Sequence, residues 1–89
     1  GLKLKNTARG QLRIIWYRQA GTTGYQLQYG KNSSFSGAKT YQFRNTVQEL
    51  NVRSLAKGTY YVRVRSYIDI GSTRYYGPWS ITKYCNVVA

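Results

Sequence analysis

The sequence predicts an all-β protein: a sandwich of two sheets built from about seven strands. Three observations predict this class. Short runs of alternating apolar and polar residues are separated by turn residues about every 8–12 positions, which is the spacing of such sandwiches. Ten of the 89 residues are Tyr and only one is Pro, so strand-forming residues are rarely interrupted. No apolar stripe of helical period reaches a useful length.

The first two strands are expected before and after a turn at residues 6–10. Leu2 and Leu4 alternate with lysines, a pattern typical of an opening edge strand. The next inward-facing row consists of Leu12, Ile14 and Trp16. Residues 20–24 are rich in Gly and Thr and predict a loop.

The middle of the chain predicts three further strands. The third contains an alternating row of aromatic and aliphatic side chains, namely Tyr25, Leu27 and Tyr29. A polar, turn-rich segment at 31–37 follows, with Phe35 expected to pack back onto the sheet. Short strands are then expected at 40–44 and near residues 50–52.

The longest strand is predicted at 60–67. Its apolar face carries Tyr60, Val62 and Val64, because strand side chains alternate between faces. Its other face carries Tyr61, Arg63, Arg65 and Tyr67. We therefore expect one face to cover the core and the other to meet solvent. Residues 68–74 are expected to form a hairpin loop with Gly71 at positive φ, and residues 81–88 a closing strand.

Tyr60–Arg65, followed by Tyr76-Gly77-x-Trp79-Ser80, resembles the end of a fibronectin type III domain of the bacterial surface type. Four features in this order also resemble a fibronectin type III domain. They are Trp16 at the end of the second strand, Gly24-Tyr25-x-Leu27-x-Tyr29, the turn through Leu55, Gly58 and Tyr60, and Gly77-Pro78-Trp79-Ser80. The resemblance implies a seven-stranded immunoglobulin-like (fibronectin type III) sandwich over residues 1–89 as one domain. The core that we expect contains Trp16, Tyr25, Leu27, Leu55, Tyr60, Val62 and Val64.

The resemblance also implies a tyrosine corner, in which a Tyr hydroxyl bonds to the preceding loop. Parity favours Tyr60 over Tyr61 for this role, because Tyr60 shares a face with Val62. The closing strand departs from the pattern, since Lys83 falls in the same parity as Cys85. A bulge near Pro78 or Trp79 would explain this irregularity.

The residue inventory argues against an active site. The chain has no His, and its only carboxylates are Glu49 and Asp69, so neither a nucleophile–His pair nor a glycosidase carboxylate pair is expected. The single Cys85 cannot close a metal site with so few other donors. We expect no enzyme activity, no cofactor and no metal. Cys85 is expected to be a small strand hydrophobe, with interchain pairing as the alternative.

The net charge of +12 suggests polyanionic partners. A basic aromatic face would consist of Tyr61, Arg63, Arg65, Tyr67, Arg74, Tyr76 and Trp79. It could bind a glycan or polyanion, but we favour an internal ladder in which Trp79 stacks on Arg63 and Arg65. This second interpretation predicts a buried, ordered Trp79.

The favoured function is a non-catalytic fibronectin type III-like accessory module of a secreted or wall-attached bacterial protein. It would act as a spacer, cell-adhesion or protein-interaction domain beside neighbouring domains, with anionic envelope polymer, glycan or acidic protein as candidate partners. A glycan- or polyanion-binding module is the alternative. A nucleic-acid-binding barrel is disfavoured, because it needs neither the tyrosine corner nor the Trp-Ser pattern. No apolar run is long enough to span a membrane, and no signal peptide is visible at Gly1.

Overall fold

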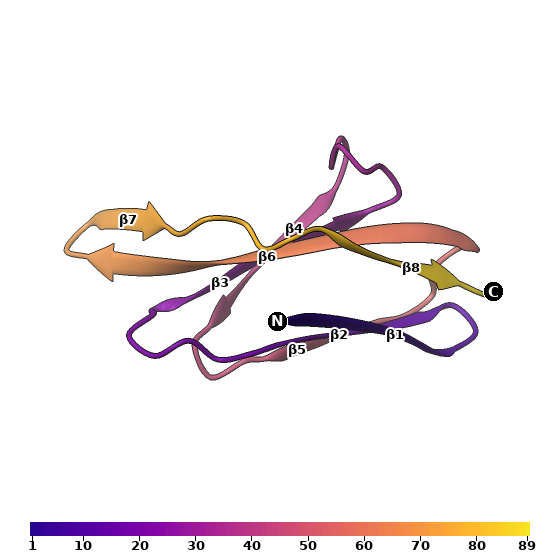
Figure 1. The fold of residues 1–89 in the computed structure, drawn as a ribbon, viewed down its shortest axis with the longest axis horizontal. Coiled ribbons are helices and arrows are strands. Elements are labelled where there is room, and N and C mark those ends of the chain that lie inside the picture. Colours follow the sequence, from indigo (N-terminus) through magenta and orange to yellow (C-terminus); the bar gives the residue numbers. More distant parts are fainter.

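The computed structural model describes all residues 1–89 and contains eight strands in two layers (Figure 1). The smaller antiparallel sheet has the order β1-β2-β5, formed by β1 (Leu2–Ala8), β2 (Gln11–Trp16) and β5 (Glu49–Val52). The larger sheet has the order β4-β3-β6-β7, formed by β4 (Lys39–Arg44), β3 (Gly24–Gly30), β6 (Gly58–Ile70) and β7 (Thr73–Tyr76), and β8 (Lys83–Val87) also pairs with β6. The predicted all-β two-sheet sandwich is confirmed. No helix capable of crossing a membrane is present.

The core lies between the two sheets and is built from the inward-facing row of each strand. Its buried members are Leu2, Leu12, Ile14, Trp16, Tyr25, Leu27, Tyr29, Tyr60, Val62 and Val87. Leu55 and Val64 are half-buried and pack against this cluster. The Trp16 ring lies 5.5 Å from the ring of Phe43. Full burial of an aliphatic side chain such as Leu27 stabilises the fold by about 1.5–3 kcal/mol. The strands therefore pack with these rows facing each other between the two sheets.

The closing strand is interrupted. Between the Tyr67–Tyr76 pair and the Val62–Lys83 pair, β6 advances five residues and its partner seven, so two extra residues are inserted between β7 and β8. This confirms the irregularity expected near Pro78. Odd-numbered residues of β7 and β8 face inward, but Trp79 lies in the interruption between them. Its ring therefore contacts arginines on the outer face of β6.

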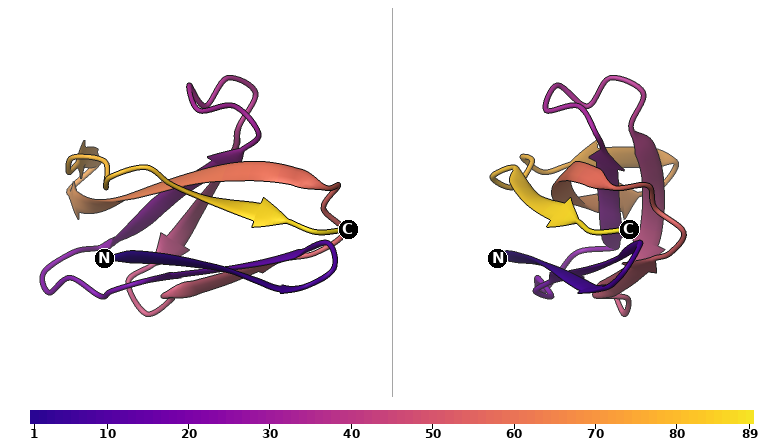
Figure 2. Two further views of the ribbon diagram at one scale, coloured as in Figure 1. Left: turned by 45° about the vertical axis from the view of Figure 1, so that its right-hand side comes forward. Right: turned by 90° about the vertical axis from the view of Figure 1, so that its right-hand side faces the viewer.

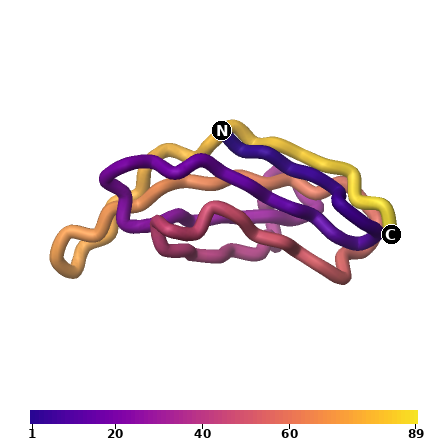
Figure 3. Tube along the Cα trace, turned by 90° about the horizontal axis from the view of Figure 1, so that it is seen from below, coloured from indigo at the N-terminus to yellow at the C-terminus, as the bar shows by residue number.

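The β6–β7 hairpin differs from the expectation. Residues 68–74 were expected to be a loop, but the strands continue to a two-residue turn at Gly71–Ser72, where Gly71 has φ 61°. The longer strands place Asp69 directly opposite Arg74, and the side chains form an ion pair that holds the arms together. The hairpin consequently projects beyond the rest of the molecule (Figure 3).

Two further strand boundaries and the burial of one side chain differ from the sequence-based expectation. β1 continues to Ala8 instead of turning from residue 6, because the Asn6 side chain donates hydrogen bonds to the carbonyls of Ala8 and Gln11. The closing strand begins at Lys83, and Ile81 is 84% exposed. Tyr67 was assigned to the solvent-facing side but is buried on that outer face, because neighbouring side chains cover it.

Candidate interaction face

Cationic and aromatic side chains alternate along the outer face of the larger sheet. The guanidinium carbon of Arg63 lies 4.2 Å from the ring centroids of both Phe35 and Trp79. The guanidinium carbon of Arg65 lies 4.2 Å from the Trp79 centroid and 3.8 Å from that of Tyr76. The Trp79 ring thus contacts two arginines, and its side chain is half-buried. Each such contact lets the ring face stabilise a cation.

The series continues toward the hairpin. The ring of Tyr76 meets that of Tyr67 edge to face at 6.1 Å, and the Arg74 guanidinium carbon lies 3.9 Å from the Tyr67 centroid. Tyr67 lies over Gly24, where any Cβ would overlap the phenol ring. We call the whole series the arginine–aromatic ladder; it consists of Phe35, Arg63, Trp79, Arg65, Tyr76, Tyr67 and Arg74.

Glutamines on β3 fix the planes of two ladder arginines. Gln28 Oε1 accepts hydrogen bonds from Arg63 Nε at 2.8 Å and from its Nη2 at 2.6 Å. Gln26 Oε1 accepts one from Arg65 Nε at 2.7 Å. The antiparallel register places each glutamine directly opposite its arginine, so the side chains meet without distortion. The guanidinium groups are therefore bound at their edges and stacked on their faces.

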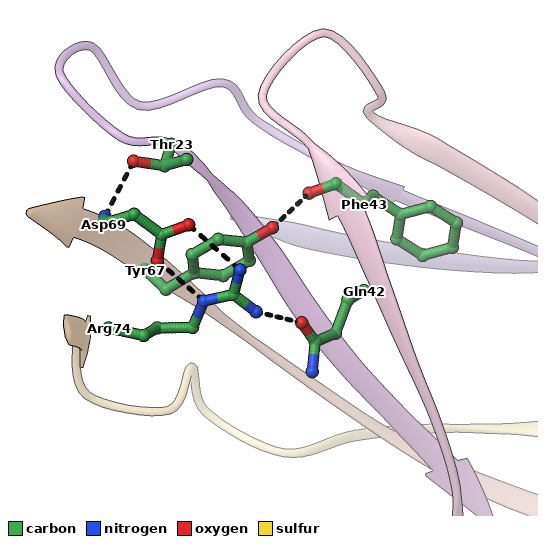
Figure 4. A network of polar contacts seen from close by, with 6 residues as sticks. All are labelled: Thr23, Gln42, Phe43, Tyr67, Asp69 and Arg74. Carbon is green, nitrogen blue, oxygen red and sulfur yellow. Dashed lines mark hydrogen bonds and ion pairs between the residues drawn. The ribbon is translucent and has the colours of Figure 1, made fainter. Parts of the chain in front are cut away.

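Arg74 ends the ladder in a polar network at the base of the hairpin (Figure 4). Its Nε and Nη2 donate to the two carboxylate oxygens of Asp69 at 2.7 and 3.0 Å, and its Nη1 donates to Gln42 Oε1. The Asp69 amide donates to Thr23 Oγ1 at 2.9 Å. The hydrogen bond from Arg74 lowers the pKa of Asp69, and Asp69 in turn raises the pKa of Arg74. The hairpin is thereby tied to β4 and to the segment before β3.

The structure brings together six of the seven residues proposed for the basic aromatic face. Tyr61 lies apart and packs against Tyr84, with ring centroids 6.0 Å apart. The sequence predicts Phe35 only as an anchor and does not indicate the glutamines as partners of the arginines. Asp69 is predicted to be a turn residue, although a carboxylate and an arginine that flank a short turn lie opposite each other in a hairpin.

The second carboxylate is also paired. Glu49 Oε1 accepts hydrogen bonds from Arg13 Nε at 3.0 Å and Nη2 at 2.6 Å, and these bonds, with one from Asn51, lower the pKa of Glu49. These are the two ion pairs of the structure, with Arg13 and Arg74, so the other cations have no Asp or Glu partner. No three side chains that could hold a metal ion come together.

Two tyrosines at the edge of the core have defined polar partners. The Tyr60 hydroxyl donates to the Ala56 carbonyl at 2.7 Å, which is the contact expected of a tyrosine corner. Burial, with a hydrogen bond to Tyr41, raises the pKa of Tyr29 to about 12. The rings of Tyr29 and Tyr41 stack at 5.9 Å. Both contacts serve packing, and neither creates a reactive group.

The structure is similar to solved fibronectin type III domains, although no protein-family model and no curated protein matches the sequence. The FN1-FN3 domains of chicken CNTN1 give a TM-score of 0.78 at 18% identity, over 99% of this chain and 29% of that chain. The fn3 domain of human contactin 1 gives 0.78 at 15% identity, over 98% and 73%. A computer-redesigned β-sandwich protein gives 0.80 at 16% identity, over 100% and 92%.

These likenesses define the architecture. The chain has the fold of a fibronectin type III domain, and it spans less than a third of the CNTN1 structure. The chicken CNTN1 structure contains several domains, FN1-FN3, in one chain.

Proposed function

We propose that the chain is a non-catalytic module of a multidomain secreted or wall-attached bacterial protein, where it serves as a spacer and adhesion or protein-interaction domain. The fold supports a modular role, since the CNTN1 structure contains several such domains in one chain. The bacterial, extracellular setting is supported by the resemblance of Tyr60–Arg65 and Tyr76–Ser80 to surface modules of that type.

One observation supports the structural role: the arginines of the basic face are bound by side chains of the same chain, in the arginine–aromatic ladder. The Nε–H of Arg63, Arg65 and Arg74 is donated within the chain, and aromatic rings cover the guanidinium faces. An incoming anion would therefore find these three Nε–H donors and the stacked guanidinium faces already engaged, and only the remaining Nη groups of Arg63 and Arg65 without a partner. The ladder instead joins β3, β6 and the interrupted closing strand into a stiff unit, which suits a spacer.

The second candidate is binding of an anionic polymer or glycan. It is favoured by the net charge of +12 and by the cations that belong neither to the two ion pairs nor to the ladder, which remain open to an anionic envelope polymer. Such binding would be diffuse and sensitive to salt, because exposed cations act together through long-range attraction. A nucleic acid would be attracted for the same reason, without sequence preference.

A titration separates the two candidates. The domain is titrated with a sulfated polysaccharide, polyphosphate, single-stranded DNA and a neutral glycan at about 0.15 M salt, where exposed charges are already screened. The structural role predicts weak binding to all polyanions that disappears with added salt. Saturable binding to one polymer, lost in Arg65→Ala while the fold is intact, would favour the ligand-binding role instead.

A further inference from the structure

A cleft of about 240 Å³ opens between the sheets beside the interruption in the closing strand. Its lining includes Trp16, Tyr17, Val64, Ser66 and Pro78. Trp16 is 2% exposed, and its Nε1 is the one buried side-chain nitrogen or oxygen without a hydrogen-bond partner. A buried donor left without an acceptor is costly. This nitrogen has almost no exposed surface, so the cleft offers an entering ligand its apolar wall rather than a free donor.

The wall of the cleft continues onto the projecting hairpin. Ser66 lines the cleft, and the next residues of the same parity on β6 are Ile68 and Ile70, which are 43% and 65% exposed. Tyr75 lies directly opposite Ile68 on the same hairpin face and is 56% exposed. This face would be core if the smaller sheet extended to cover it, but the two layers seen in Figure 2 end before the tip of the β6–β7 hairpin (Figure 1). An apolar strip thus leads outward from the cleft.

Contacts on the opposite face of the β6–β7 hairpin hold the apolar strip in place. The opposite face of the hairpin carries Asp69 and Arg74, whose ion pair locks the two arms, and the Asp69 amide is bonded to Thr23. The Thr23 amide in turn donates to the Tyr67 carbonyl at 2.9 Å. A surface fixed in this way loses little conformational freedom when a partner binds.

Charge identifies the kind of occupant. Both carboxylates of the chain are already paired, and neither lines the cleft. Lys3 lies near the mouth, with its Nζ 5.9 Å from the Tyr17 ring centroid. A second copy of the chain would bring another net charge of +12 to the same place and is opposed by repulsion. The favourable partner is acidic.

We propose that the cleft and the apolar strip form one groove that binds an extended acidic peptide segment of a partner protein. One aliphatic side chain of the segment would occupy the apolar strip formed by Ile68, Ile70 and Tyr75, and a second would enter the cleft beside Val64 and Pro78. The flanking acidic side chains would meet the surrounding cations. This inference takes from the proposed function only that the partner is a protein. The spacer role does not depend on the groove and stands even if the groove binds nothing.

The test uses capped seven-residue peptides and ¹H–¹⁵N NMR of the whole chain. The first peptide has leucine-valine-leucine between pairs of aspartates; a second has alanines at the centre, and a third has lysines in place of the aspartates. The first peptide should shift the Trp16 indole N–H and the amides of Ile68 and Ile70, and the other two should bind at least about tenfold more weakly. The amides of Leu50 and Val52 on β5 provide an internal control, because neither residue lines the cleft.

Variants separate groove binding from attraction by charge. The double variant Ile68→Ser with Ile70→Ser should weaken binding about tenfold or more. Ile81→Ser is the matched control, because this 84% exposed isoleucine does not line the groove, and it should leave binding unchanged. Dispersed spectra of both variants establish that they fold. Equal binding of the alanine peptide, an unaffected double variant or no shift at millimolar concentration would each overturn the proposal.

Discussion

Replacement of Trp79 by alanine should destabilise the domain, because it removes the ring that contacts two half-buried arginines. The two contacts lie at 4.2 Å, and each contributes about 0.5–2 kcal/mol depending on desolvation. With about 1 kcal/mol per contact, the expected loss is about 2 kcal/mol. In a domain of this size, 1 kcal/mol corresponds to about 4–8 °C, so the melting temperature should fall by about 8–16 °C.

The assay is urea unfolding followed by far-UV circular dichroism, with thermal melting as a second measure. Tyr75→Ala is the matched control: Tyr75 lies on the other face of the hairpin, is 56% exposed and takes no part in the ladder, so its loss should cost less than about 1 kcal/mol. A double-mutant cycle with Arg65→Ala should give a coupling of about 1 kcal/mol. Equal stabilities for Trp79→Ala and Tyr75→Ala would refute the reasoning.

Three other substitutions test separate parts of the fold. Tyr60→Phe removes the hydroxyl bond to the preceding loop and should lower the free energy of unfolding by about 1 kcal/mol, measured by urea denaturation. Gly24→Ala should cost about 1–3 kcal/mol or prevent folding, because its Cβ would overlap the Phe43 carbonyl and the Tyr67 ring; a stable variant would contradict this packing. Because Arg74 lowers the folded-state pKa of Asp69, this pair stabilises the domain above the unfolded pKa of about 4 and loses its contribution as pH falls through the folded value. Stability measured between pH 7 and pH 2 should therefore fall less steeply in Asp69→Asn than in the parent.

Local alternation was sufficient to predict the sandwich and most of its inward-facing rows. Leu12, Ile14, Leu27 and Val62 each lie on the inward-facing row predicted for their own strand, and all four are buried, because a residue pattern of period two specifies the core face directly. The overall fold class follows from such rows and from the turns between them.

The ladder was only partly predictable, because it depends on contacts between distant segments. Phe35 comes from a loop and Trp79 from the interrupted closing strand, and they meet at Arg63 only through the register of β3 and β6. Tyr67 shows the same limit, since parity places it on the outer face but cannot reveal that Arg74 covers it. Burial on an outer face arises from tertiary contacts that alternation does not contain.

The central claim is that the basic face is closed by its own side chains. The Nε–H signals of Arg63, Arg65 and Arg74 in a ¹H–¹⁵N spectrum test it most directly, because all three groups donate within the chain. We predict three sharp signals, shifted by the neighbouring rings and unchanged by polyphosphate at about 0.15 M salt. Averaged signals like those of free arginine, or signals that move saturably with polyphosphate, would contradict the account.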